Sequence, residues 1–228
     1  MKRVLIMGCG GAGKSTLADA LSQRTGLPVI PLDGHFWTPG WVQESPERWQ
    51  AKSNELTARP EWILDGNYGS TMERRLERAD TAILIDRAPL LCLWRVFRRR
   101  LKWSGKVRPG LPDGCVERLS LEFVHYILTW RLLRLPGVLK RLEGARERGV
   151  AVHVLRSDAE IEAFLDSAST KPPPLSSHVR PKLARANGAE RRFRPALVPL
   201  WLFRIEILRA NRLLRPSRRT LRRKPKQR

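Results

Sequence analysis

The sequence predicts an α/β fold, a three-layer α/β/α domain with a five-stranded parallel sheet and a basic C-terminal extension. Short apolar runs alternate with longer amphipathic segments, which is typical of strands joined by helices into a parallel sheet. A glycine-rich turn follows the first apolar run directly, where α/β folds bind phosphate. The expected strands are residues 3–7, 28–32, 62–64, 81–85 and 150–155.

Six segments between these strands have helical periodicity, and Pro46 and Pro89 are suited to first-turn positions. Two segments interrupt the pattern. Residues 33–45 are rich in Gly, Pro and Trp, and residues 102–114 mix Lys and Arg with Gly and Pro. Long loops in a compact domain are more often functional than idle. The expected helices are residues 14–25, 46–58, 70–78, 89–102, 117–147 and 158–168.

The charge of the chain is uneven along its 228 residues. Residues 1–170 hold 26 Lys and Arg against 20 Asp and Glu, whereas residues 171–228 hold 18 against 2. A Lys-Pro-Pro-Pro run begins at Lys171. The sequence therefore predicts one folded domain over residues 1–170 and a basic Pro/Arg-rich tail over residues 171–228.

The tail contains one apolar stretch, residues 196–203, followed by apolar residues among arginines. Two interpretations stay open. One is a disordered, solvated extension. The other is a basic amphipathic helix after Pro199, which would bind nucleic-acid phosphate, an anionic membrane surface or the domain itself.

The three cysteines, Cys9, Cys92 and Cys115, are widely spaced and form no CxxC pair, so neither a disulfide framework nor a zinc site is indicated. The apolar run at residues 4–7 is too short for a signal peptide, and no stretch approaches the roughly 20 apolar residues of a membrane span. We therefore expect a cytoplasmic protein without a membrane span.

The glycine-rich turn matches the phosphate-binding pattern GxxxxGK[ST]. Glycines leave room for successive N–H groups to point at phosphate oxygens, and the following helix presents its positive end. Lys14 is expected to reach the β and γ phosphates, and Ser15 to ligate Mg²⁺. The sequence thus predicts an ATP·Mg²⁺ site. Its residues are Gly8, Gly10, Gly11, Ala12, Gly13, Lys14, Ser15 and Thr16.

The same turn also matches GxGxxG, and Asp33 lies 20 residues beyond Gly13, about where a dinucleotide-binding fold places its ribose-binding acid. A lysine at position 14 has no required role in a dinucleotide turn, whereas a triphosphate site needs one. The full signature after a strand therefore favours a triphosphate over a dinucleotide or a glycine turn without ligand. No NKxD guanine motif occurs, which disfavours GTP.

Two carboxylates are candidates for chemistry beside the phosphates. Asp65 ends the apolar run 62–64 at the sheet edge where ligands of α/β folds bind, so it is expected to hold Mg²⁺ through water. Asp33 also ends an expected strand and is a candidate for acceptor or metal binding. The alternative for each is a turn-forming Asp before Gly.

The helix that begins at Pro89 carries Arg95 and Arg99, which are four residues apart and therefore share one face. Both are expected to neutralise charge as a phosphoryl group moves. The neighbouring basic loop, with Lys106, Arg108 and Arg118 in or near it, favours a lid that closes over phosphate. The alternative is a solvated basic surface.

Three tryptophans, Trp37, Trp41 and Trp49, cluster after Asp33, where an acceptor would bind. They either stack on a planar ligand or pack a short loop against the core, and packing is the favoured interpretation.

Several motifs resemble P-loop proteins of the DNA topology modulation (FlaR-like) family, which is related to adenylate kinases and shikimate kinases. The resemblance spans roughly residues 1–168. It rests on the phosphate loop, Pro31-Leu32-Asp33, Phe36-Trp37, Pro39-Gly40-Trp41, the run from Trp62 to Tyr68, Arg75-Leu76 before Ala79-Asp80, and Leu91 to Arg95 leading into residues 98–101.

The resemblance implies a P-loop NTPase fold of the nucleoside-monophosphate-kinase type, with an acceptor-binding segment after the second strand and a lid after the fourth. It implies that Arg95 and Arg99 lie at the lid base and that Arg156 contacts the adenine. Adenylate kinases place an acceptor-gripping arginine after their Asp-Gly, but this chain has Asn67. AMP as acceptor is therefore disfavoured, with Arg75 as the candidate substitute.

The sequence thus predicts an ATP-dependent kinase for a small molecule or nucleotide, with Lys14, Arg95, Arg99 and Asp33 as its catalytic residues. An acceptor that is already a phosphate needs no base, whereas a hydroxyl acceptor can use Asp33. The alternative is a nucleotide-dependent regulatory or nucleic-acid-associated protein with weak or no kinase activity. The acceptor stays open.

Overall fold

The computed structural model describes residues 1–168. The predicted domain boundary near residue 170 and the amphipathic helix after Pro199 lie outside the described residues, and both stay predictions. Within the described part of the chain, no helix is long and apolar enough to cross a membrane.

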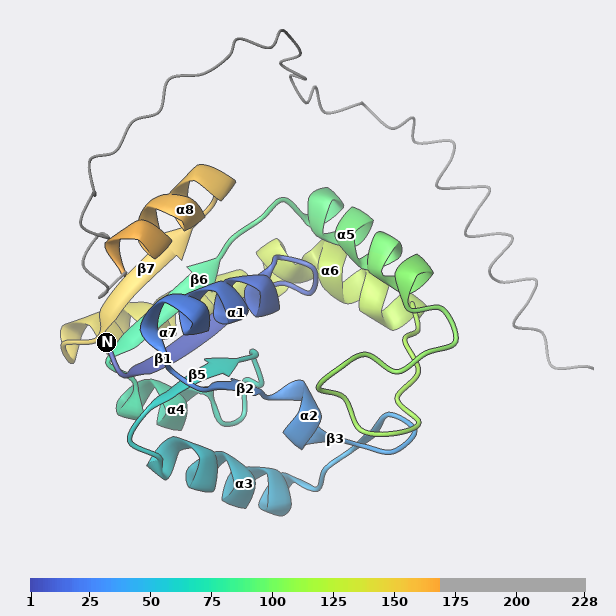
Figure 1. Ribbon diagram of the computed structural model, residues 1–228, viewed down its shortest axis with the longest axis horizontal. Coiled ribbons are helices and arrows are strands. Elements are labelled where there is room, and N and C mark those ends of the chain that lie inside the picture. The colour runs from blue at the N-terminus through green and yellow to red at the C-terminus, as the bar shows by residue number, and fades with distance from the viewer. Residues whose placement is uncertain (169–228) are drawn as a thin grey trace, which may run out of the picture. The chain divides into compact units, whose positions relative to one another are not determined.

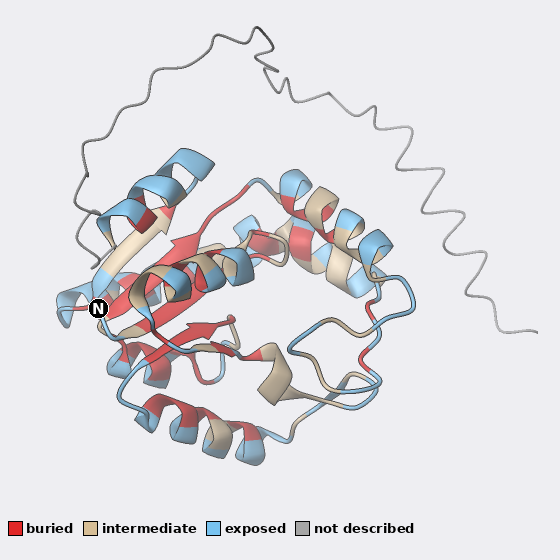
Figure 2. Ribbon diagram, viewed as in Figure 1, coloured by how far each residue is buried: buried red, intermediate tan, exposed pale blue. Residues whose placement is uncertain are grey.

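A five-stranded parallel sheet forms the centre of the domain, which confirms the predicted fold class (Figure 1). The strands lie in the order β2-β5-β1-β6-β7, so the first strand in the chain is the middle one. Apolar residues at positions 4–7 have no exposed surface, and Figure 2 shows the central strands as buried. The strands are β1 (Arg3–Gly8), β2 (Val29–Pro31), β5 (Trp62–Asp65), β6 (Thr81–Ile85) and β7 (Ala151–Leu155).

The register of the sheet brings the ends of three strands to one edge. Asp65, the last residue of β5, pairs with Ile6 of β1, and Gly8 at the end of β1 pairs with Ile85 at the end of β6. Because all pairs are parallel, the loops after these strands open at the same carboxyl edge, where ligands of open α/β sheets bind.

Helices cover both faces of the sheet: α1 lies in front of it and α7 behind it (Figure 1). Pro46 and Pro89 lie in the first turns of two helices, as predicted. The Ser45 side chain caps the first of these helices by accepting from Arg48 N at 3.3 Å. The helices outside the two interrupting segments are α1 (Lys14–Thr25), α3 (Pro46–Ala58), α4 (Met72–Arg78), α5 (Pro89–Lys102), α6 (Leu121–Leu133), α7 (Leu135–Glu147) and α8 (Asp158–Ser167).

The single helix predicted over residues 117–147 is wrong. Ser120 caps α6 by accepting from Phe123 N at 3.2 Å, so residues 117–119 belong to the preceding loop. Pro136 lies in the first turn of α7, where its missing N–H is tolerated but where the preceding helix cannot continue through it. The segment is therefore two helices, α6 and α7.

Residues 33–45, which the sequence predicts as a loop, contain the short helix α2 (Asp33–Phe36) and a hairpin of β3 (Trp37–Thr38) and β4 (Val42–Gln43). We call this part the 33–45 segment. After α5, residues 103–119 form a second excursion that is closed by an antiparallel bridge between Val107 and Val116. We call it the 103–119 loop.

These two excursions contact each other directly. Trp41 Nε1 donates to Val116 O at 2.8 Å, and Cys115 Sγ lies 3.4 Å from Thr38 O. The backbones also touch, because a Cβ added to Gly34 would lie 2.4 Å from Gly110 O. Residues far apart in the sequence thus form one layer at the carboxyl edge of the sheet.

Candidate nucleotide and phosphoryl-transfer site

The loop between β1 and α1 depends on glycine at two positions in particular. Gly11 has a φ of 82°, and a Cβ there would lie 2.3 Å from Cys92 O. Gly13, at the N-cap of α1, has a φ of 105°. Side chains at both positions would be strained by conformation, and at Gly11 also by contact. The loop is therefore tight and lies directly against α5.

The N-terminus of α1 is open for an anion. No side chain caps it, and its first turn holds no acidic residue, so its N–H groups keep their positive character. Lys14 folds back over the loop and donates from Nζ to Cys9 O at 3.1 Å. Ser15 and Thr16 follow as exposed residues at the same end. This arrangement fits the phosphates of a nucleotide.

Asn67 is a functional candidate that the sequence argument did not assign. Its Oδ1 accepts from Gly8 N at 3.0 Å, and its Nδ2 donates to Gly8 O at 2.7 Å. The same Nδ2 also donates to Tyr126 OH at 3.1 Å. Asn67 thus holds the start of the phosphate loop, and the only sequence signal was its place after Asp65-Gly66.

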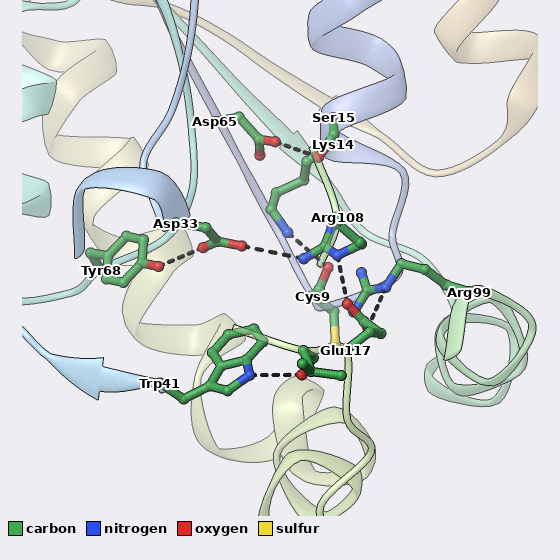
Figure 3. A network of polar contacts seen from close by, with 11 residues as sticks. Cys9, Lys14, Ser15, Asp33, Trp41, Asp65, Tyr68, Arg99, Arg108 and Glu117 are labelled. Atoms are coloured by element: carbon green, nitrogen blue, oxygen red, sulfur yellow. Dashed lines mark hydrogen bonds and ion pairs between the residues drawn. The ribbon is translucent and has the colours of Figure 1, made fainter. Parts of the chain in front are cut away.

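Asp65 and Ser15 lie in contact beside the phosphate loop (Figure 3). Ser15 Oγ donates to Asp65 Oδ2 at 2.6 Å, whereas Asp65 Oδ1 is buried and has no hydrogen-bond partner within residues 1–168. Burial raises the pKa of Asp65, and Lys14 and the Ser15 hydroxyl oppose this shift. A buried carboxylate oxygen without a donor is what a cation would satisfy.

The donor set fits Mg²⁺ held jointly with phosphate oxygens. Mg²⁺ in nucleotide sites keeps water and needs only one or two protein oxygens, which Ser15 Oγ and Asp65 can supply. Among residues 1–168, no group of three or more His, Cys, Asp and Glu side chains gathers to hold a metal alone. The described residues therefore fit a metal that arrives with a nucleotide.

Asp33 is the first residue of α2 rather than the last residue of a strand. The strand stops at Pro31, and Leu32 N bonds Asp65 O at 2.9 Å. Asp33 Oδ1 accepts from Tyr68 OH at 2.5 Å, while Oδ2 lies 4.0 Å from Arg108 Nη2. The carboxylate is half-exposed and thus open to a ligand.

Arg95 and Arg99 lie one turn apart on α5, as their spacing predicts, but they contact different parts of the site. Arg95 Nη1 donates to Ala12 O of the phosphate loop at 3.2 Å. Arg99 Nε donates to Glu117 Oε1 at 2.8 Å, and burial lowers its pKa. The first arginine thus adjoins the nucleotide side of the site and the second adjoins the 103–119 loop.

Glu117 was also missed by the sequence argument, because it falls in the segment expected to be helical. Its side chain is 2% exposed, and its other oxygen, Oε2, accepts from Arg108 Nε at 2.6 Å. Figure 3 shows Arg108 linked to Glu117 on one side and to Asp33 on the other. No local pattern marks a glutamate that pairs with arginines from two segments.

The tryptophan cluster packs as expected. Trp49 is 2% exposed and its ring lies 5.2 Å from Phe36 and 5.0 Å from Tyr68. Trp37 and Trp41 meet edge to face at 5.3 Å within the hairpin. The cluster fixes the 33–45 segment and the ring of Tyr68 beside Asp33.

Arg156, predicted at the adenine, lies exposed after β7. Its backbone N donates to Glu160 Oε2 at 2.7 Å, and its Nε lies 3.8 Å from Asp86 Oδ2. Its side chain is 63% exposed, and its contact with adenine stays a prediction.

Arg75 does not face the acceptor side, which corrects the expectation that it replaces a phosphate-gripping arginine. Its side chain is fully buried, and it donates to the carbonyls of Gly66, Asn67 and Tyr68. Tyr68 has a φ of 38°, which is unusual for a non-glycine residue. Arg75 therefore stabilises the turn that directs Tyr68 toward Asp33.

Arg75→Met is accordingly expected to lower the free energy of unfolding by about 3 kcal/mol, because three backbone carbonyls lose charged donors. Urea unfolding of the full-length chain, followed by circular dichroism, measures this change. Arg78→Met, at an exposed position of the same helix, is the matched control and is expected to change stability by less than about 0.5 kcal/mol. Equal effects of the two variants would contradict the assigned role.

Comparison with known proteins leaves the family open, since no family model matches the chain. The uncharacterized protein YqaC of Bacillus subtilis (strain 168) is 36% identical over 67 residues, which is 28% of this chain and 38% of YqaC. The chain thus matches well under half of this relative's length.

Solved structures of two kinases align with this chain at low similarity. Shikimate kinase from Acinetobacter baumannii in complex with shikimate aligns with a TM-score of 0.46 and 16% identity, over 73% of this chain and 90% of that chain. A gluconokinase from Sinorhizobium meliloti 1021 aligns with a TM-score of 0.42 and 16% identity, over 74% and 89%. No assignment of activity rests on these similarities.

Proposed function

We propose that this chain is an ATP-dependent phosphotransferase that moves the γ-phosphoryl group of ATP·Mg²⁺ to a small acceptor. The observation that carries the proposal is the pair of Ser15 Oγ and Asp65 Oδ2 at 2.6 Å, beside an uncapped helix N-terminus and Lys14. Phosphoryl transfer needs phosphate binding, a metal anchor and cations around the transferred group, and this edge of the sheet offers all three.

The donor half of the proposed site consists of the phosphate loop and its neighbours. Residues 8–16 bind the phosphates through backbone N–H groups, and Lys14 exchanges Cys9 O for phosphate oxygens. Ser15 and Asp65 hold Mg²⁺, which supplies charge neutralisation at the β and γ phosphates when bound. Arg95 reaches the same loop from α5, where it neutralises charge on the leaving side. Arg156 remains the proposed adenine contact.

The acceptor half contains Asp33, and its surroundings favour a hydroxyl acceptor over a phosphate. Within residues 1–168, Asp33 Oδ2 accepts no hydrogen bond, whereas Oδ1 is occupied by Tyr68. The guanidinium of Arg75 is committed to backbone carbonyls, and the cation beside Asp33 is Arg108, which already lies 4.0 Å from Oδ2. Asp33 thus takes the hydroxyl proton as the oxygen attacks phosphorus and the bond to the ADP oxygen breaks.

The same assignments support a distant kinship with the FlaR-like family, which stays part of the proposal. Its motifs coincide with residues that this site uses: Asp33, Asp65, Asn67, Arg95 and Arg99.

A screen of acceptors tests the proposed function. Full-length protein with ATP·Mg²⁺ is mixed with nucleoside monophosphates, nucleosides and neutral hydroxy compounds, and ADP release is measured against the protein without acceptor. Stimulation by a hydroxy compound is the expected result. If no acceptor raises ADP release while ATP still binds, the kinase proposal fails and a nucleotide-dependent regulatory role replaces it.

Asp33→Asn provides the matched prediction for the acceptor half. The amide cannot take a proton, so turnover with a hydroxyl acceptor is expected to fall by about 10²–10⁴-fold. The affinity for ATP, measured by calorimetry, is expected to stay within about twofold, because within residues 1–168 Asp33 hydrogen-bonds Tyr68 and lies 4.0 Å from Arg108 but bonds no residue of the phosphate loop. A loss of ATP affinity equal to the loss of turnover would place Asp33 in the nucleotide site instead.

A further inference from the structure

The ion-paired cluster of Glu117, Arg99 and Arg108 lies between the phosphate loop and Asp33. We propose that Glu117 is a positioning residue that holds Arg99 and Arg108 as a pair of cations for the γ-phosphate. The inference rests on the proposed ATP-dependent phosphotransfer and adds Arg108 to the residues that contact the transferred group.

The geometry shows one carboxylate shared by two guanidinium groups. Glu117 Oε1 accepts from Arg99 Nε at 2.8 Å, and Oε2 accepts from Arg108 Nε at 2.6 Å. Each arginine bonds Glu117 through its Nε–H alone, although a guanidinium has five N–H donors. Its Nη groups are therefore held in a fixed orientation while they stay available for another anion.

The location of the cluster points to the transferred phosphoryl group. Arg99 stands one helix turn beyond Arg95, which donates to Ala12 O of the phosphate loop at 3.2 Å. Arg108 Nη2 lies 4.0 Å from Asp33 Oδ2 on the acceptor side. The pair thus spans the path from donor to acceptor, where charge spreads over the equatorial oxygens of the moving phosphoryl.

Burial explains why a carboxylate is needed there. The side chains of Arg99 and Arg108 are 29% and 19% exposed, and that of Glu117 is 2% exposed. Two guanidinium groups this close and this buried repel each other, and one carboxylate between them offsets the repulsion. Without it the two side chains separate, and the γ-phosphate loses both oriented donors.

The test compares ATP·Mg²⁺ with ADP·Mg²⁺, which differ by the γ-phosphate. Isothermal titration calorimetry on the full-length chain gives both dissociation constants, and Glu117→Gln is expected to reduce the preference for ATP about tenfold. A general loss of folded protein weakens both nucleotides equally and leaves this ratio unchanged. Asp113→Asn, at an exposed carboxylate of the same loop, is the matched control and is expected to keep the ratio.

Two further variants keep the inference open to contradiction. Arg108→Lys keeps the charge but removes the Nε–H, so it is expected to reduce the ratio even if Glu117→Gln does not fold. In an Arg99→Ala/Arg108→Ala background, adding Glu117→Gln is expected to change the ratio less than twofold. A wild-type protein that binds neither nucleotide overturns the proposed function itself. If the wild type prefers ATP to ADP and both the Glu117→Gln and the Arg108→Lys variants keep the same preference, only the positioning role of Glu117 is overturned.

Discussion

Lys14→Ala is expected to lower phosphoryl transfer from ATP by about 10³-fold, because the variant loses the cation that neutralises the β and γ phosphates. Within residues 1–168, the Lys14 side chain makes one hydrogen bond, to Cys9 O at 3.1 Å. The free energy of unfolding is therefore expected to change by less than about 1.5 kcal/mol. The variant is therefore expected to lose activity without a matching loss of stability, because the Lys14 side chain binds the ligand and contributes little to the fold.

The measurement combines ADP release, ATP affinity by calorimetry and thermal unfolding. Lys140→Ala, at an exposed lysine of α7, removes the same charge far from the phosphate loop and is expected to retain wild-type turnover. Equal turnover in the Lys14→Ala and wild-type proteins would exclude the phosphate loop as the donor site.

Asp65→Asn is expected to abolish the Mg²⁺-dependent part of ATP binding and turnover, with a loss of about 10²–10³-fold, and at the same time to stabilise the fold. Asp65 is 8% exposed and its Oδ1 has no partner within residues 1–168. A neutral amide of the same shape avoids the cost of burying this charge. Without Mg²⁺ at pH 7, the free energy of unfolding is expected to rise by about 1 kcal/mol.

The pH dependence follows from the direction of the pKa shift. Burial raises the pKa of Asp65 above its ordinary value of 3.8, so the folded protein holds its proton at a pH where the unfolded chain has lost it. The wild-type protein therefore loses stability as the pH rises from 3.8 through the folded pKa, and the Asn variant does not. The stability difference is expected to vanish below pH 3.8 and to grow as the pH rises through the folded pKa.

Thermal unfolding of both proteins across this range, with EDTA and with Mg²⁺·ADP, checks the prediction. Ligand is expected to raise the midpoint of the wild type more than that of the variant. Asp19→Asn, at an exposed carboxylate of α1, serves as the matched control. A variant that is less stable than wild type at pH 7 would show that the buried carboxylate is a structural group.

The parts of the fold that the sequence predicted correctly are those fixed by local chemistry. The apolar runs at residues 4–7 and 82–85 lie in the buried strands β1 and β6, and Pro46 lies in the first turn of α3, where its missing N–H is tolerated. Pro136 marks the break before α7, and the prediction of one helix over residues 117–147 did not take it into account.

The candidate site likewise contains residues that local patterns in the sequence suggest and residues that only the structure brings together. The phosphate loop and Asp65 were recognisable because spacing along one strand and one turn defines them. Glu117, Asn67 and the backbone contacts of Arg75 were not, because each joins segments whose proximity depends on the whole fold. Arg75 is the clearest case. An arginine at this position of the sequence is a reasonable phosphate-binding residue, and only its complete burial in the structure shows that its donors are already used.

The contact between the 33–45 segment and the 103–119 loop has a thermodynamic consequence. The bond from Trp41 Nε1 to Val116 O and the close approach of Gly34 to Gly110 join the two excursions directly. A molecule that orders the segment near Asp33 therefore also orders the loop that carries Arg108. Linkage then requires cooperativity in both directions: the acceptor tightens ATP binding by the same factor by which ATP tightens binding of the acceptor.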